Sequence, residues 1–224
     1  MPKVVDHRER RKQVAIATSE LIAESGVDAV TIRAIAERLR FSTAIVQHYF
    51  SNKRQLLLFT LRMEGSLGQH RVETAVAHDP ADLVGLLAAM LPLDAVRIRA
   101  WKTWLVYWSS ATLDPDIAIE QRRLFDAVRA MIAHSLRIHD SNPDLRRDID
   151  TELVARRLLA LTHGIGMEAV CHPDDWPSPR QLAALSVEIR DATGLDMTRY
   201  EREELDRLRR SARRSGAKAA AREG

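Results

Sequence analysis

Hydrophobic residues recur at intervals of three and four along most of the chain, and no segment alternates apolar and polar positions over the length of a strand. This pattern predicts helices throughout. The first covers residues 8–25 and ends at Ser25-Gly26, where glycine favours a C-terminal stop. Its inward stripe consists of Val14, Ala17, Leu21 and Ile22.

Two short helices follow, with a tight break between them. Thr31 has the position of an N-cap for the first, whose apolar residues are Ile32, Ile35, Ala36 and Leu39. The break covers residues 40–42, and the second helix runs to about residue 50. The segment 52–55, Asn-Lys-Arg-Gln, then has the form of a capping box in which Asn replaces Ser or Thr, so it predicts the start of a long helix.

Five more helices are expected beyond Asp79-Pro80, at residues 81–91, 94–111, 117–139, 149–170 and 179–193. The sequence therefore predicts an all-α fold in which an N-terminal three-helix head, containing a helix-turn-helix, is joined to a larger helical body. We expect the head at residues 1–53, the body at 54–195 and a tail at 196–224. The tail has few large apolar residues to bury, so we expect it to be mobile.

Composition narrows the class of protein. Hydrophobic residues make up 46% and charged residues 29%, as in soluble globular domains. No uncharged run approaches the ~18–20 residues that span a bilayer, and the basic N-terminus has no apolar stretch behind it to act as a secretory signal. The single cysteine excludes an internal disulfide framework, and we expect a cytoplasmic protein without membrane contact.

The net charge of +3 is unevenly distributed along the chain. Residues 1–53 hold nine Lys/Arg and six Asp/Glu, residues 54–195 hold sixteen and nineteen, and residues 196–224 hold nine and six. The head and the tail are therefore basic and the body is acidic. Basic segments favour a polyanionic partner, although a surplus of three does not identify one.

The phase of the second short helix suggests what it contacts. Ile45 and Tyr49 lie four residues apart, as do Val46 and Phe50, and these pairs form the inward face and its flank. The outward positions are Thr43, Ala44, Gln47 and His48. Such short, uncharged side chains suit base edges in a DNA major groove, because Gln pairs with adenine and methyl groups contact thymine. The alternative is a helical hairpin that only packs on the body.

Residues 17–57 resemble the DNA-binding head of TetR-family transcriptional regulators. The resemblance rests on Gly26, on Thr31-Ile32 before Ile35-Ala36, on Ser42, and on Tyr49-Phe50 followed by Lys53 and Leu56-Leu57. It implies phosphate contacts at Thr31 and Lys53, base contacts at Thr43, Ala44 and Gln47, and a backbone contact by the Tyr49 hydroxyl. It implies packing roles for Ile35, Ala36, Ile45 and Val46. Candidate DNA-binding residues are thus Thr31, Arg40, Ser42, Thr43, Ala44, Gln47, His48, Tyr49 and Lys53, with His48 equally interpretable as a solvated side chain.

Two turn residues depart from the family pattern. Arg40 stands where the family has a small residue or glycine, and Phe41 stands where it has a small aliphatic residue. Arg40 is therefore expected either to adopt a left-handed conformation or to add a phosphate contact. The family often has Tyr at the position of Gln47, so a different base preference is implied.

The segment AWKTWLVYW, residues 100–108, contains three of the four tryptophans. Trp101, Trp104 and Trp108 follow helical spacing, with Tyr107 beside them, so they form either ordinary core or the wall of a ligand cavity, including a cage for a quaternary ammonium group. Neighbouring helices offer further candidates. The proposed ligand-binding residues are Met90, Trp101, Trp104, Tyr107, Trp108, Phe125, Met131, His134, His163 and Met167.

Residues 97–172 also resemble the ligand-binding body of the BetI-like branch of the family, on the basis of Arg99–Trp101, Trp104, Trp108 and the segment Leu161–Ile165. His163 replaces the acidic residue common before Gly164. The family resemblance implies that helices 149–170 and 179–193 pair with their copies in a homodimer. Their apolar faces, which are alternatively internal core, are Leu153, Leu158, Leu161 and Ile165 on one helix and Leu182, Leu185 and Ile189 on the other.

Signals for enzymes are weak. The histidines and the lone cysteine lack metal-ligand spacing, and the chain contains neither a Gly-rich phosphate loop nor G-x-S-x-G. We therefore expect no catalytic residues, metal or cofactor. The sequence favours a homodimeric repressor that binds a palindromic operator on double-stranded DNA and releases it when a small molecule binds the body. The rival is a helical ligand-binding or enzymatic protein whose head packs or contacts protein.

Overall fold

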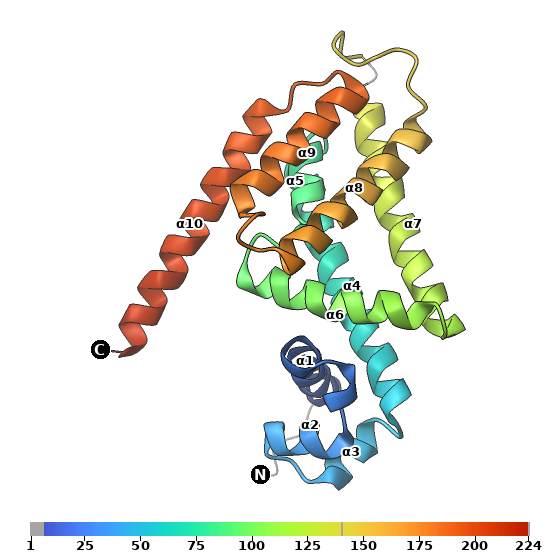
Figure 1. Cartoon of the computed structure of the whole chain (residues 1–224), viewed down its shortest axis with the longest axis vertical. Helices are drawn as coiled ribbons and strands as arrows, with labels where there is room; N and C mark the ends of the chain where they lie inside the picture. The colour runs from blue at the N-terminus through green and yellow to red at the C-terminus, as the bar shows by residue number, and fades with distance from the viewer. Residues whose placement is uncertain (1–6, 140, 224) are drawn as a thin grey trace. The chain divides into compact units, whose positions relative to one another are not determined.

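The computed structural model describes residues 7–139 and 141–223, with side chains as far as Arg214. The first six residues of the expected head and the last residue of the expected tail lie outside the described residues. Within the described part the chain is all-α, as predicted, with no strand (Figure 1). The elements are α1 (His7–Ser25), the short 3-10 helix η1 (Val27–Ala29), α2 (Ile32–Leu39), α3 (Thr43–Tyr49), α4 (Lys53–His78), α5 (Leu83–Ala88), α6 (Ala95–Ala111), α7 (Pro115–Ile138), α8 (Thr151–Cys171), α9 (Ser178–Thr193) and α10 (Thr198–Glu223).

The chain forms two compact units that differ from a simple division at residue 53. Unit 1 contains Met1–Gln69 and Ala95–Phe125, and unit 2 contains His70–Asp94 and Asp126–Gly224. The helices α4 and α7 each contribute residues to both units. As a result, α6 and the start of α7 group with the helix-turn-helix rather than with the rest of the expected body.

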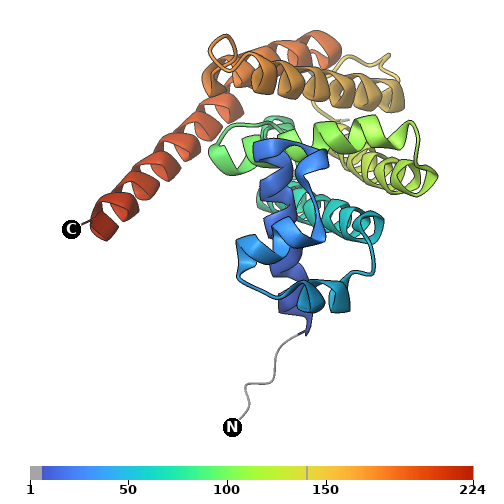
Figure 2. The same cartoon turned by 60° about the horizontal axis from the view of Figure 1, so that its bottom comes forward.

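The core of unit 1 joins the first three helices to the start of α4. In Figure 2 these helices, coloured from blue to cyan, lie against one another, and α1 packs against both α2 and α6. Burial of the apolar stripes that the helical spacing predicts accounts for this packing. The buried members of the cluster are Val14, Ala17, Ile22, Val30, Ile35, Ala36, Val46, Phe50 and Leu56.

Capping and a left-handed residue set the tight turn between α2 and α3. The Thr31 hydroxyl accepts a hydrogen bond from the backbone N–H of Ala34 at 3.0 Å, so Thr31 is the predicted N-cap. At the other end of α2, Arg40 has φ 54° and ψ 40°, which is the left-handed conformation expected for a position that favours glycine. Phe41 packs against the core of unit 1, and the Arg10 guanidinium lies 4.7 Å from its ring centroid.

The core of unit 2 lies among α5, α8 and α9, with α7 contributing from Asp126 onward. Helix α5 packs against α9, and α8 packs against α9. Side chains with no exposed surface supply the apolar interior, namely Leu83, Leu86, Leu87, Leu91, Ile132, Leu158, Leu182, Leu185 and Ile189.

The C-terminal segment differs from the expected mobile tail. It forms the long helix α10, which packs against α5 and α9. Met197 and Glu204 are buried and Leu205 and Leu208 are half-buried, so the first half of the segment has more to bury than its composition suggested. Through Arg214, the side chains beyond Leu208 are exposed.

None of the described helices combines the length and the apolarity that crossing a membrane requires.

Replacing Arg40 by glycine tests the strain at the turn. Glycine adopts the left-handed region without a Cβ clash, so Arg40→Gly should raise the free energy of unfolding by about 1 kcal/mol, measured by urea denaturation. Arg40→Ala keeps the Cβ and should change stability by less than about 0.5 kcal/mol. Equal effects of the two substitutions would show that the arginine side chain, not the backbone conformation, determines stability at this position.

Candidate functional site

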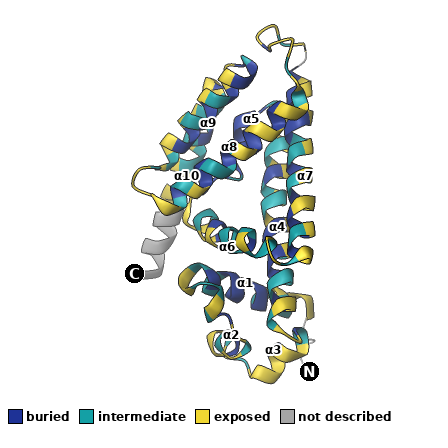
Figure 3. Cartoon of the chain, turned by 45° about the vertical axis from the view of Figure 1, so that its right-hand side comes forward, coloured by how far each residue is buried: buried dark blue, intermediate teal, exposed yellow. Residues whose placement is uncertain are grey.

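Helix α3 presents the face that its sequence phase predicts. Thr43, Ala44, Gln47 and His48 are all exposed, and the helix is coloured largely as exposed in Figure 3. Val46, on the opposite side, has no exposed surface. The outward edge is therefore uncharged at Thr43, Ala44 and Gln47 and is rich in hydrogen-bonding groups and methyl groups, while burial on the other face fixes the helix in place.

Ile45 was expected in the core but is 43% exposed. It precedes Val46 by one position, and successive helical residues point about 100° apart, so only one of the two can face the core directly. Val46 takes that place together with Phe50, which is also fully buried. Ile45 consequently borders the exposed edge formed by Thr43 and Ala44.

The starts of α3 and α4 are both capped. The Ser42 hydroxyl accepts from the backbone N–H of Ile45 at 3.3 Å. The Asn52 carboxamide oxygen accepts from the backbone N–H of Gln55 at 2.9 Å, which is the forward half of the predicted capping box. The reverse half is displaced by one residue, because the Gln55 side chain accepts from the backbone N–H of Ser51, not of Asn52.

The Lys53 ammonium group has a partner within the protein. Its Nζ donates to the carbonyl oxygen of Val27 at 2.7 Å, which ties the first turn of α4 to η1. An ammonium group has three donors, so this bond leaves two for an external acceptor. Lys53 is thus both a structural contact and a candidate phosphate ligand.

Three rings lie together beside the exposed edge of α3. The Tyr49 ring centroid is 5.2 Å from that of His48 and 5.7 Å from that of His7, and the two histidine rings are 5.9 Å apart. Tyr49 is half-buried against the core of unit 1. The start of α1 therefore contacts the end of α3, which sequence spacing did not reveal.

Two arginines of the head are held in ion pairs. Arg33 pairs with Glu37 at 2.8 Å, and the Arg38 guanidinium donates to both Glu24 carboxylate oxygens at 2.7 and 2.8 Å. The hydrogen bond from Arg38 lowers the pKa of Glu24. Arg40 is exposed and has no ion-pair partner among the residues that the structure describes, so it remains available to an anion.

Helix α6 is bonded to two helices of the head. The hydroxyls of Ser19 on α1 and Thr103 on α6 are 3.1 Å apart, and both residues are buried. The Tyr107 hydroxyl donates to the carbonyl oxygen of Leu57 on α4 at 2.7 Å. Burial raises the pKa of Tyr107, so its hydroxyl keeps its proton and remains a donor.

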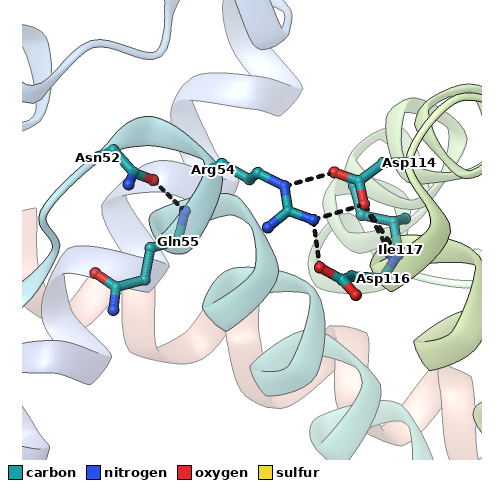
Figure 4. Close-up of polar contacts among 6 residues, drawn as sticks. All are labelled: Asn52, Arg54, Gln55, Asp114, Asp116 and Ile117. Atoms are coloured by element: carbon teal, nitrogen blue, oxygen red, sulfur yellow. Dashed lines mark hydrogen bonds and ion pairs between the residues drawn. The ribbon is translucent and has the colours of Figure 1, made fainter.

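A third connection joins the start of α4 to the segment between α6 and α7 (Figure 4). Arg54 Nε donates to Asp114 Oδ2 at 2.9 Å and Arg54 Nη2 donates to Oδ1 at 3.1 Å, with a further bond from Nη2 to Asp116. The hydrogen bond from Arg54 lowers the pKa of Asp114. Asp114 Oδ1 also accepts from the backbone N–H groups of Asp116 and Ile117, so the same carboxylate caps α7.

The aromatic residues of unit 1 form two groups. Trp101 and Trp108 contact each other edge to face with centroids 5.6 Å apart, and Trp108 contacts Phe125 at 6.0 Å. Trp104 and Tyr107 instead pack with Leu61 and Ile117. The interpretation of Trp101, Trp104 and Trp108 as one wall thus needs correction, since Trp104 packs with a different cluster from the other two, from which it is offset by about 60° and 40° in helical phase.

The remaining ligand-binding candidates lie in unit 2. Met90, Met131 and His163 are half-buried, and burial lowers the pKa of His163 to about 4. His134 and Met167 are exposed, so neither is enclosed within its unit as the wall of a cavity would be. Their neighbours Ala133, Ser135, Gly166 and Ala169 occupy the inward positions instead.

The faces assigned to a dimer interface divide into two sets. Leu158, Ile165, Leu182, Leu185 and Ile189 are buried within a single chain, so for these residues the alternative of internal core is correct. The apolar side chains of α8 and α9 that stay exposed are Leu153 at 54%, Met167 at 43% and Val187 at 44%. A surface for a second copy would therefore be formed by different residues of the same helices.

No group of three or more His, Cys, Asp or Glu side chains among the described residues is arranged to hold a metal ion. Cys171 is an exposed free thiol.

Two family matches together cover most of the chain. Residues 16–58 match the family "Bacterial regulatory proteins, tetR family", and residues 80–194 match "BetI-type transcriptional repressor, C-terminal". The chain is 30% identical over 177 residues to the HTH-type transcriptional regulator PksA of Bacillus subtilis, covering 77% of this chain and 84% of that protein. It is 33% identical over 145 residues to the HTH-type transcriptional regulator BetI of Paraburkholderia phymatum, covering 61% and 74%.

Solved structures show the same relationship. A putative transcriptional regulator from Saccharomonospora viridis, in complex with choline, has a TM-score of 0.77 and 27% identity and covers 83% of this chain and 98% of its own. A transcriptional regulator from Rhodococcus sp. Rha1 has a TM-score of 0.73 and 26% identity at the same coverage.

Protonation of His163 provides a test of its burial. The folded-state pKa of about 4 lies below the unfolded value of about 6.5, so between these values the unfolded chain binds more protons and stability falls as the pH falls. Because of this group, the free energy of unfolding at pH 5 should be about 2 kcal/mol lower than at pH 7.5. The His163→Gln variant, measured by urea unfolding, should lack this pH-dependent loss of stability.

Met167→Leu changes a residue one helical turn away that does not titrate, and this variant should keep the pH dependence of the wild type. The assignment fails if His163→Gln and the wild type lose the same stability between pH 7.5 and pH 5.

Proposed function

Because the chain belongs to the TetR family of transcriptional regulators, we propose that it is a repressor that binds a palindromic operator through α3 and releases it when a small molecule binds. The observation that carries the proposal is the exposed edge of α3, with Thr43, Ala44 and Gln47 facing outward from a helix anchored by Val46 and Phe50. These side chains have the size and chemistry that read base edges in the major groove.

Phosphate contacts would fix the register of α3 on the duplex. Lys53 retains two donors after its bond to Val27, and Arg40 is exposed at the turn before α3. The Tyr49 hydroxyl and the N-terminal turn of α2 behind Thr31 supply neutral donors. Ser42 has its hydroxyl committed to capping α3, so its contribution would be to the position of the helix.

A palindromic operator requires two copies of α3, and we assign the dimer interface to the exposed sides of α8 and α9. Along α8, Leu153, Ala160, Gly164 and Met167 follow steps of three, four and seven residues on one side of the helix. A Cβ added at Gly164 would meet no heavy atom within 4 Å, so this side is open to a partner helix. Val187 extends the apolar surface onto α9.

Release of the operator needs a ligand that binds the DNA-incompetent conformation more tightly. Trp101 and Trp108 share one side of α6, whereas Thr103 and Tyr107 bond to the head from another. A ligand that displaces the indoles would move α6 and with it the contacts to α1 and α4. Organic cations are the first effector class to test, because aromatic faces bind them and the related S. viridis protein was solved with choline.

The rival function, a helical ligand-binding protein or enzyme whose head only packs or contacts protein, predicts no DNA affinity. A gel-shift assay with DNA upstream of the protein's own gene separates the two. The repressor should form a sequence-preferring complex at submicromolar protein that weakens with added salt, and its absence at low salt would refute the proposal.

Base and phosphate contacts should respond differently to substitution. Gln47→Ala should cost about 1–3 kcal/mol of operator affinity and relax the preference at one base pair, because it removes a base contact. Lys53→Met keeps the aliphatic stem but removes the charge, so it should weaken all sequences alike and reduce the salt slope by about 1. Identical behaviour of the two variants would overturn these roles.

Tyr107→Phe tests the connection between α6 and the head without changing charge. Loss of the hydrogen bond to Leu57 should weaken the connection between α6 and α4 by about 1 kcal/mol. Operator affinity should therefore fall about fivefold, with the preferred sequence unchanged. Amide hydrogen exchange in the first turns of α4 should accelerate.

Thr162→Val is the control, because Thr162 is also fully buried but its hydroxyl bonds only to its own helix at Leu158. Equal losses of operator affinity in Tyr107→Phe and Thr162→Val would indicate a general effect of stability.

A further inference from the structure

Helix α10 divides into an acidic first part and a basic second part. Residues 196–206 contain five acidic and two basic side chains. Residues 207–222 contain seven basic side chains and none that is acidic. The basic ones are Arg207, Arg209, Arg210, Arg213, Arg214, Lys218 and Arg222. The helix is continuous from Thr198 to Glu223, so this division occurs within one helix.

The acidic part is held by its own unit. Glu204 is buried and pairs with Arg207 at 3.1 Å, and Arg207 also approaches Asp82 of the cap of α5 at 3.9 Å. Leu205 and Leu208 are half-buried. These contacts anchor α10 on unit 2 as far as Leu208.

Beyond the anchor, as far as the described side chains extend, the helix is exposed on every side. All six residues from Arg209 to Arg214 are exposed, and in Figures 1 and 2 this end of α10, in dark red, extends past α5 and α9. Arg209 pairs with Asp206 at 3.3 Å. Within the described side chains, Arg210, Arg213 and Arg214 have no ion-pair partner.

The three arginines share one face of the helix, because Arg213 and Arg214 follow Arg210 by three and four positions. In the sequence, Lys218 and Arg222 continue the step of four. Like charges at this spacing repel one another, so the arrangement lowers the stability of the free helix by a few tenths of a kcal/mol per pair. A polyanion would remove that repulsion.

The helix macrodipole does not account for this cluster. The dipole favours cations within about the last turn, whereas the basic stretch begins about four turns before the end of α10. A helix that lies on a membrane needs a broad apolar face with large side chains, and after Leu208 the only apolar residues of this stretch are alanines. The chemistry therefore favours the phosphates of a nucleic acid over a lipid surface.

We propose that the segment Arg209–Glu223 of α10 is a second DNA-binding element, which contacts the phosphate backbone of double-stranded DNA without reading its sequence. It spans about 22 Å as a helix, enough for several phosphates along one strand. This element increases the affinity of the protein for DNA of any sequence, in addition to the affinity that the helix-turn-helix provides. It does not depend on α3 binding a specific operator.

The test is a salt titration of DNA binding by the full chain. The variant Arg210→Gln, Arg213→Gln, Arg214→Gln removes three charges and keeps good helix formers. The control variant, Arg190→Gln, Arg199→Gln, Arg202→Gln, removes the same charge from exposed positions outside the basic segment. Circular dichroism and thermal melting verify that both variants are folded.

We expect the magnitude of the slope of log K against log salt concentration to decrease by about 3 per protomer in the first variant and by less than about 1 in the control. The decrease should be the same on the operator and on unrelated duplexes. Specificity, as the ratio of the two affinities, should be unchanged. Equal slopes in wild type and first variant would overturn the proposal and identify the segment as a solvated surface.

Binding to vesicles that contain phosphatidylserine tests the alternative that the segment contacts a membrane. If the first variant loses vesicle binding while its DNA slope stays that of the wild type, the segment is a membrane contact and the proposal is wrong. If no duplex is preferred over another but the three arginines still control the salt slope, the operator function fails and this proposal stands.

Discussion

The buried hydroxyl groups of Thr103 and Tyr107 constrain the whole of unit 1. One bonds to α1 and the other to α4, and these are the two helices between which α2 and α3 are folded. A buried hydroxyl that loses its partner costs about 1–3 kcal/mol, so α6 does not separate from the head without a substantial loss of stability. The orientation of α3 therefore depends on where α6 lies, even though the two helices are far apart in sequence.

Much of the fold follows from local patterns in the sequence. Helical periodicity predicted the α-helices from α1 to α9, and the caps at Thr31 and Asn52 fixed where α2 and α4 begin. The left-handed conformation of Arg40 was one of two alternatives that followed from the small residue or glycine of the family at this position. The outward positions of α3 followed from phase alone, because a helix that is seven residues long has only one side to bury.

The errors share a physical cause, which is that periodicity does not say which apolar face meets which partner. Helices α8 and α9 are apolar on more than one side, so the sequence left open whether Leu185 faces a second copy or the interior, and it lies in the core of one chain. Ile45 and Val46 are equally apolar neighbours, and only packing decides between them. The contacts of Lys53 with Val27 and of Arg54 with Asp114 join residues 26 and 60 positions apart, beyond any local signal.

The pairing of arginines with glutamates on α2 has a kinetic consequence. Arg33 and Arg38 are neutralised by carboxylates of the same unit, so neither adds a free positive charge to the field that the head produces at the Debye length of about 8 Å. Electrostatic steering accelerates association only when such a field is strong. In the proposed complex with DNA, steering would therefore come from Arg40 and the basic end of α10, and not from these two arginines of α2. The residence time of the head in that proposed complex would be set by the short-range fit of Thr43, Ala44 and Gln47 to the bases.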